Sequence, residues 1–256
     1  MTVEAGVLRR LVWVLVLMTV ASGARAGSGI GLRWGSCEGY SNRNFACDGS
    51  TGAEVLVASF SPPSGLDVVT GVSAFVRVSS ATGTVPAWWQ LSASGCRFGA
   101  ITLSADMSDV SDCEDPWSGQ AMGGLVGFVS DSDGLLFQVA VAVPPSAART
   151  AGAGRSYAAF KLLVNHRRSA GPGACDGCNT PVCISLQAMT LGQPQRKPCN
   201  PVEDPGCGQD LIVLTQGIAS AGVAGNVVTW QGGTPRCGAG GAKPATWSEL
   251  KKRFHP

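Results

Sequence analysis

Residues 72–80 read Val-Ser-Ala-Phe-Val-Arg-Val-Ser-Ser, and their alternation decides the fold. In an extended chain successive side chains point to opposite faces. One face then carries Val72, Ala74, Val76 and Val78, and the other carries Ser73, Arg77 and Ser79. This period of two predicts a half-buried β-strand. Residues 157–165 repeat it, with Phe160, Leu162 and Val164 set against Lys161 and Asn165.

Short β-branched or alternating stretches, bounded by Gly, Pro, Ser or Asp, recur along the rest of the chain. No stretch in its body keeps a helical period for three turns, so a TIM barrel or a Rossmann sheet is disfavoured. We predict an all-β fold, an antiparallel β-sandwich or jelly roll stapled by disulfides, with a short C-terminal helix. The expected strands are Ala53–Phe60, Val72–Ser80, Trp88–Leu91, Leu135–Val143, Tyr157–Asn165, Val182–Leu191, Leu211–Gln216 and Asn226–Gln231.

The N-terminus has the layout of a secretory signal peptide. Arg9 and Arg10 precede the apolar run Leu11–Val20, and the small-residue sequence Ala24-Arg25-Ala26 follows. The apolar run is half the length that a membrane span needs. We therefore expect residues 1–26 to be removed, with an uncleaved anchor as the alternative, and the mature chain to be secreted or at the cell surface.

The charge balance excludes a strongly basic nucleic-acid binder. The formal net charge of the 256-residue chain is +2, and loss of residues 1–26 removes three basic residues and one acid, which leaves zero. Neutralising nucleic-acid phosphates needs a surplus of Lys and Arg. With 45% hydrophobic residues the chain can fill a core, so disorder throughout is excluded as well.

Ten cysteines follow the signal peptide, an even number in a compartment where disulfides persist. Spacing favours local bridges that join Cys37 to Cys47, Cys96 to Cys113 and Cys199 to Cys207. The other four, Cys175, Cys178, Cys183 and Cys237, allow three pairings. Of these, Cys178 with Cys183 and Cys175 with Cys237 would tie the late part of the chain to its middle.

The run Cys175–Cys183 allows two further interpretations. Its three thiolates with His166 would make a zinc site, and its first Cys-x-x-Cys would make a redox motif. An oxidising compartment opposes zinc, and Asn179-Thr180-Pro181 leads into a strand-like stretch where a redox motif would need a helix. Structural disulfides are the favoured interpretation.

The body of the protein is expected to span residues 27–233. Gln193–Gly208 resembles a surface insertion that carries its own bridge, and residues 234–245 form a Gly/Pro-rich linker. Residues 246–256 open on a capping-box pattern and place Trp247, Leu250 and Phe254 on one helical face. This short amphipathic helix could dock on its own domain, serve as a recognition tail, or fray.

Catalytic signatures are scarce. The chain has two histidines, His166 and His255, and lacks the common nucleophile, zinc-helix and phosphate-loop motifs. We therefore expect no enzymatic activity. The alternative is a secreted hydrolase, with calcium as a possible aid, that draws a carboxylate pair from Asp106, Asp109, Asp112, Glu114 and Asp115.

Two features suggest ligands. Asp131 and Asp133 precede Gly134 as in a fragment of a calcium loop, although Asp-Gly is equally a hairpin signal. Trp88 and Trp89 are adjacent in a strand-like stretch, which would turn one indole outward. That indole, with Trp34 and Trp117, would stack on a sugar or on a partner's apolar surface, unless a loop covers it.

Several short sequences resemble a group of uncharacterised secreted, cysteine-rich bacterial proteins that have no assigned activity. They are LRWGSC (32–37), FAC (45–47), PAWWQ (86–90), CDGC (175–178), PVCI (181–184), VTWQGG (228–233) and TW (246–247). The resemblance implies a shared architecture and no catalytic residues. The strand-rich layout is also similar to cohesin-type or carbohydrate-binding jelly rolls. The function we expect is an extracellular binding or structural module that recognises glycans or a surface partner.

Overall fold

The computed structural model describes residues 28–66, 68–80, 83–131, 134–194, 211–215, 217, 219–220, 223–232 and 252. Four expectations therefore concern residues outside the described part, namely the signal peptide, the Cys199–Cys207 bridge, the linker at 234–245 and the C-terminal helix apart from Lys252.

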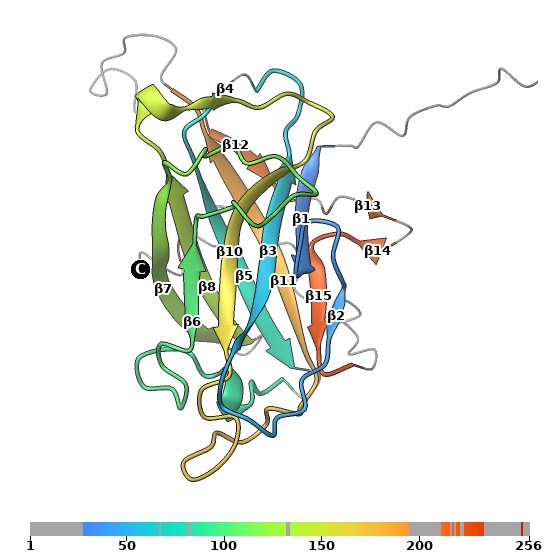
Figure 1. The fold of residues 1–256 in the computed structure, drawn as a ribbon, viewed down its shortest axis with the longest axis vertical. Helices are drawn as coiled ribbons and strands as arrows, with labels where there is room; N and C mark the ends of the chain where they lie inside the picture. Colours follow the sequence, from blue (N-terminus) through green and yellow to red (C-terminus); the bar gives the residue numbers. More distant parts are fainter. Residues whose placement is uncertain are drawn as a thin grey trace, which may run out of the picture.

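The described chain consists of β-strands and two short 3-10 helices (Figure 1). In order they are β1 (Gly29–Trp34), β2 (Asn42–Arg43), β3 (Ala53–Ser61), β4 (Val68–Val69), β5 (Gly71–Ser80), η1 (Ala87–Trp89), β6 (Ile101–Ser104), β7 (Met122–Asp131), β8 (Gly134–Ala142), η2 (Pro145–Ala147), β9 (Arg149–Thr150), β10 (Tyr157–Asn165), β11 (Val182–Gly192), β12 (Leu211–Leu214), β13 (Ala219–Ser220), β14 (Val223–Ala224) and β15 (Val227–Trp230).

Two sheets face each other and form a β-sandwich (Figure 1). The smaller sheet has the order β1-β3-β10-β6, and the larger has the order β2-β15-β11-β5-β8-β7, with β12 also paired to β11. Pairing in both is antiparallel except between β2 and β15. The predicted all-β, disulfide-stapled sandwich is confirmed.

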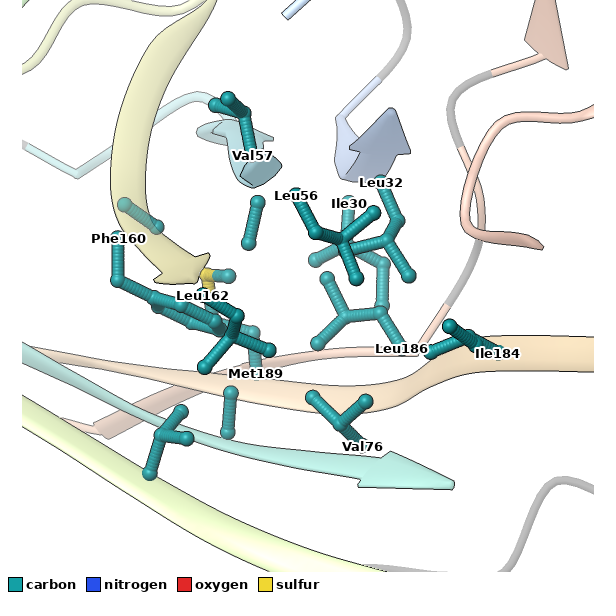
Figure 2. Close-up of a cluster of buried hydrophobic side chains, with 14 of the residues drawn as sticks. Ile30, Leu32, Leu56, Val57, Val76, Phe160, Leu162, Ile184, Leu186 and Met189 are labelled. Carbon is teal, nitrogen blue, oxygen red and sulfur yellow. The ribbon is translucent and has the colours of Figure 1, made fainter. Parts of the chain in front are cut away.

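The core lies between the sheets, and the alternation in β5 positions one wall of it. Val76 is paired with Leu186 of β11 on one side and with Phe137 of β8 on the other. Figure 2 shows Leu162 and Phe160 of β10 facing Met189 and Val76 of the larger sheet. All of these side chains are buried. Burial of such side chains is the dominant favourable term in folding.

A segment between β6 and β7, residues 105–121, covers the outer face of the smaller sheet; we call it the crossing segment. Figure 1 shows it passing in front of β10 and β3 to the side of β1 and returning to β7. Met107, Val110 and Trp117 of this segment belong to the hydrophobic core. The alternation in β10 predicted a solvated polar face that includes Lys161. This prediction is wrong at Lys161, which is buried beneath the crossing segment and forms an ion pair with Asp109.

Most predicted strands are present, but one is not, and eight strands of the structure were missed. A strand was expected at Trp88–Leu91. The structure instead has the 3-10 helix η1, which covers Ala87–Trp89. The longer strands β1, β6 and β7 had no prediction, and neither had the two-residue strands β2, β4, β9, β13 and β14. In β7, three glycines among ten residues hide the strand because glycine weakens intrinsic strand preference.

The hairpin predicted at the Asp-Gly sequence joins β7 to β8, with Asp131 paired to Gly134. Gly134 has φ +129°, and a Cβ built on it would lie 2.1 Å from the carbonyl oxygen of Val78. Only glycine fits this close approach between β8 and β5.

The disulfides connect distant loops, and two of the predicted local pairs, Cys37–Cys47 and Cys96–Cys113, are wrong. The bridges join Cys37 to Cys113, Cys47 to Cys178 and Cys96 to Cys175, across 76, 131 and 79 residues. Cys183 is also disulfide-bonded, and Cys199, Cys207 and Cys237 lie outside the described residues. Cys178 therefore does not pair with Cys183, nor Cys175 with Cys237. In the chain-entropy model a loop of this length is worth about 4–5 kcal/mol, against about 2–3 for the expected local loops.

Truncation of a core side chain should be costly. We expect Phe160→Ala to lower the free energy of unfolding by about 3–5 kcal/mol, because it removes apolar burial and leaves a cavity. Val126, which is 58% exposed, provides the control, and Val126→Ala should stay within about 0.5 kcal/mol. Urea unfolding followed by circular dichroism measures both. Equal, small losses in the two variants would contradict the assigned core.

The disulfide pattern can be read from tryptic peptides under non-reducing conditions. Cleavage should leave the peptide 34–43 bound to 98–149, and both 44–77 and 78–97 bound to 169–196. Local pairing would instead join 34–43 to 44–77 and 78–97 to 98–149. Mass spectrometry of the linked peptides distinguishes the two patterns, and the second would refute the connectivity described here.

Candidate functional site

One end of the sandwich is closed by an aromatic cluster of four indoles, Trp34, Trp88, Trp89 and Trp230. Trp88 stacks on Trp230, with ring centroids 4.9 Å apart and planes 21° apart. Trp89 meets both rings edge-on, at 5.0 and 5.7 Å, and Trp34 lies 5.9 Å from Trp230. All four are at most 2% exposed. The cluster fills the space beneath the end loops.

The predicted ligand-stacking role of the tryptophans does not fit this geometry. Because η1 is a 3-10 helix, Trp88 and Trp89 do not alternate between two faces, and both are fully buried. Trp34 lies in the same cluster. Trp117, the fourth candidate, belongs to the crossing segment, is fully buried, and donates its Nε1–H to the carbonyl of Ala159 at 2.9 Å. None of these indoles can stack on a ligand without local unfolding.

Two disulfides and three hydrogen bonds fix the loops around this cluster. Cys175 and Cys178 both lie in the β10–β11 loop and connect it to the loops that carry Cys96 and Cys47. Indole N–H groups of the cluster also bind loop and strand atoms. Trp230 donates to the carbonyl of Cys178 at 2.7 Å, Trp88 to Ser169 Oγ at 2.9 Å, and Trp34 to the carbonyl of Thr229 at 3.0 Å.

The zinc and redox interpretations of the Cys175–Cys183 run are not supported. A cysteine in a disulfide offers no thiolate to a metal. Cys175 and Cys178 form disulfides to different loops and not to each other. His166 is 7% exposed and stacks on Phe45 at 3.8 Å, with Nδ1 2.8 Å from the carbonyl oxygen of Thr51. His166 therefore has a structural role at the end of β10.

The acidic residues proposed for a hydrolase hold the crossing segment in place. Asp109 pairs with Lys161, Glu114 pairs with Arg155 at 2.6 Å, and the Asp115 carboxylate accepts the backbone N–H of Trp117 at 2.8 Å. The pKa of Asp106 is lowered, first by the backbone N–H of Ser108. A glycosidase acid needs a raised pKa.

Asp112 ties the crossing segment to the loop after β1. Its carboxylate accepts the backbone N–H groups of Glu38 at 2.7 Å and Cys37 at 3.1 Å. Burial favours the neutral form of Asp112, but these bonds and one from Ser36 outweigh it and lower its pKa. Asp112 also lies near Cys37 and Cys113 in the metal-ligand-like group found among the described residues, but both cysteines are in a disulfide.

The calcium prediction at Asp131 and Asp133 meets an opposing charge. Arg77 donates from both terminal nitrogens to the two carboxylate oxygens of Asp131, at 2.7 and 3.1 Å. This guanidinium already neutralises Asp131 and repels a second cation. Asp133 lies outside the described residues.

Two hollows border the end loops and meet at Gly95. The first, which we call the polar hollow, has a volume of about 410 Å³. It lies between the loop that follows β5, the loop that follows η1, and the β7–β8 hairpin. Its lining residues are mostly small or hydroxyl-bearing: Gly83, Thr84, Val85, Gln90, Ser92, Ser94, Gly95, Ser130, Asp131 and Gly134.

The second, which we call the basic hollow, has a volume of about 90 Å³ and holds three arginines, Arg97, Arg167 and Arg168. Arg97 is 1% exposed, and its guanidinium carbon lies 3.4 Å above the Trp88 ring. Burial, and next the charge of Arg167, lower the pKa of Arg97 to about 9. Gly95, Cys96, Phe98 and Ala100 complete the lining.

Neither hollow follows from the sequence analysis. Gln90, Ser92 and Ser94 carry no motif, and their approach to the β7–β8 hairpin depends on the sandwich. A partial signal exists for the basic hollow, since Arg167-Arg168 lies in one loop and Arg97 follows a cysteine. The Cys96–Cys175 bridge, which was not predicted, joins these two loops.

A scan against protein-family models finds no match for the chain, and a search of curated proteins finds none either. Among solved structures the chain is similar to the second type II cohesin module from the cellulosomal adaptor ScaA scaffoldin of Acetivibrio cellulolyticus. The identity is 8% and the TM-score 0.28, over 64% of this chain and 84% of that one.

Within the part of the chain that the structure describes, no helix has the length and apolar character to cross a membrane.

The crossing segment should make stability sensitive to acid through Asp112. Its pKa is lower in the folded than in the unfolded state, so its contribution is complete above the unfolded value of about 3.9 and is lost as pH falls through the folded value. We expect Asp112→Asn to cost about 1 kcal/mol at neutral pH, and this difference to shrink towards about pH 2.

Urea midpoints measured against pH test this expectation. Asp48 is exposed, and no ion pair or hydrogen bond joins it to another residue in the described part of the chain. Asp48→Asn is therefore the matched control and should follow the wild type. A constant difference between Asp112→Asn and wild type at all pH values would exclude the proposed role of the Asp112 charge.

Proposed function

We propose that this protein is an exported, non-enzymatic binding module that recognises a saccharide in the polar hollow. The observation that carries the proposal is the lining itself, which combines hydroxyl and amide groups with backbone at the loop end of a disulfide-pinned sandwich. Loops held by a rigid scaffold are where binding residues concentrate. Three long-range disulfides support an oxidising, extracellular compartment.

The composition of the polar hollow favours binding over hydrolysis. Among the described residues of its lining there is one carboxylate, Asp131, and that carboxylate is neutralised by Arg77. Glycoside hydrolysis as a rule needs two carboxyl groups, one of them a proton donor. The lining residues that the structure describes include no histidine, lysine or cysteine to replace them as acid, base or nucleophile.

The loops around the polar hollow are preorganised. The backbone carbonyl oxygen of Gln90 accepts a hydrogen bond from the backbone N–H of Arg97 at 3.1 Å. A Cβ built on Gly95 would lie 2.1 Å from the same oxygen. The next residue, Cys96, is bridged to Cys175. A loop closed in this way loses little conformational entropy when a ligand binds, which improves affinity.

Saccharides suit this lining because each ring presents several hydroxyl groups that both donate and accept hydrogen bonds. Gln90 and Ser94 are exposed, and their side chains offer the same two functions to a ligand. The other partner expected from the sequence is a protein of the cell surface. A protein partner would, however, need a much larger contact area than the hollow.

Substitutions in the lining should separate binding from folding. We expect Gln90→Ala to weaken saccharide binding about 2–10-fold, the value of one hydrogen bond, and Ser94→Tyr to abolish it by filling the hollow. Both residues are exposed, so the melting temperature should stay close to that of the wild type. A glycan-array screen of the mature protein, followed by calorimetric titration of the variants, measures these effects.

The matched control is Ser146→Tyr, because Ser146 is exposed in η2 and does not line the hollow. Binding that survives Ser94→Tyr, or the absence of any glycan ligand, would refute the proposed saccharide site.

A further inference from the structure

We infer that the basic hollow binds an oxyanion group, and that the saccharide recognised by this protein is therefore an acidic one, carrying carboxylate or sulfate. The site for the oxyanion rests on the geometry of the arginines. Its assignment to a saccharide rests on the function proposed above.

The three arginines of the basic hollow form no ion pair with any carboxylate that the structure describes. Ion pairs among the described residues involve Arg43, Arg77, Arg155, Lys161 and His166, and none involves an arginine of this hollow. Of the charged groups that act on Arg97, the one resolved is Arg167, which carries the same sign. The mature chain is neutral overall, so this is a local surplus of positive charge.

Arg97 is held rigidly, although without a counter-charge. Its Nε–H donates to the carbonyl of Arg167 at 2.9 Å, one terminal nitrogen donates to the carbonyl of Trp88 at 3.0 Å, and the other donates to the carbonyl of Asn165. A guanidinium has five N–H groups, so these three bonds leave two that can meet a ligand. A buried charge without an opposite charge is costly, and an anion would relieve that cost.

Arg167 and Arg168 add two exposed guanidinium groups at the rim. Arg168 has a φ of +59° and donates to the carbonyl of Cys96 at 2.6 Å, so its side chain folds back across the hollow. A Cβ built on Gly99 would lie 3.8 Å from Arg167 Nη1. The Arg167 guanidinium therefore lies close to the loop that carries Arg97 and Gly99. Guanidinium groups bind carboxylate and sulfate oxygens through pairs of charge-assisted hydrogen bonds.

The size and position of the basic hollow indicate that it receives an acidic substituent of the saccharide, while the sugar ring lies in the polar hollow. Its volume of about 90 Å³ is less than a quarter of the 410 Å³ of the polar hollow. The two hollows share Gly95, so a saccharide in the larger one can extend an acidic group into the smaller one. Phe98, which is 59% exposed on the rim, offers an apolar ring beside this path.

The test compares ligands that differ only in charge. Calorimetric titrations of the mature protein would use short oligogalacturonides, their carboxyl-reduced counterparts, and inorganic sulfate, each at matched ionic strength. We expect the acidic oligosaccharides to bind at least about tenfold more tightly than the reduced ones. The variant Arg167→Gln/Arg168→Asn should bring this ratio close to one; asparagine tolerates the positive φ at position 168.

Two controls keep the result interpretable. Arg149 is an exposed arginine in β9, outside both hollows, and Arg149→Gln should leave the ratio unchanged. The single variant Arg167→Gln alters only an exposed side chain. If the double variant folds poorly, this single variant takes its place. It should lower the ratio of affinities without a change in melting temperature.

The outcomes separate the two proposals. Equal binding of acidic and reduced saccharides, abolished by Ser94→Tyr, would overturn the oxyanion site and uphold the saccharide site. Binding of sulfate that depends on Arg167 and Arg168, with no saccharide bound, would uphold the oxyanion site and overturn the saccharide as its source. A charge preference that survives in the double variant would overturn the inference.

Discussion

Two cysteines three residues apart, Cys175 and Cys178, hold one end of this molecule together. Each bridges to a different loop, so the β10–β11 loop, the loop after η1 and the loop before β3 are fixed against one another. Such bridges close 79 and 131 residues of chain, and in the chain-entropy model they are worth about 4–5 kcal/mol each. The aromatic cluster packs beneath these loops because this frame leaves a closed apolar space for it.

The same frame holds a cation that no carboxylate of the described chain pairs with. The loop of Cys96 carries Arg97, and the loop of Cys175 carries Arg167 and Arg168, so the bridge between them gathers three guanidinium groups. Arg97 lies on the face of Trp88, where a desolvated cation–π contact contributes about 2 kcal/mol. That contact offsets part of the cost of burial. It leaves the positive charge uncompensated, and this is the physical basis for an oxyanion ligand.

The sequence was sufficient for the fold class and insufficient for the site. The alternation at residues 72–80 predicts β5 to within one residue, because a sheet with one face on a core imposes that period. Disulfide partners could not be predicted, since spacing favours short loops and the sandwich brings distant loops together. Trp88 and Trp89 were misassigned because periodicity cannot distinguish three strand residues from one turn of 3-10 helix. The arginines of the basic hollow lie 70 residues apart in sequence, and neighbourhood in the chain gives no sign of their meeting.

The central claim is that the end loops form one rigid, two-part site for an acidic saccharide. The most direct measurement is a titration of the isotope-labelled mature protein with galacturonic acid oligomers, followed through its backbone amide resonances. The account predicts saturable shifts that are confined to the lining of the two hollows and centred on Gly95, with Arg97 and Phe98 on one side and Gln90 on the other. Shifts that are absent, or that cluster on the outer strands far from these loops, would contradict it.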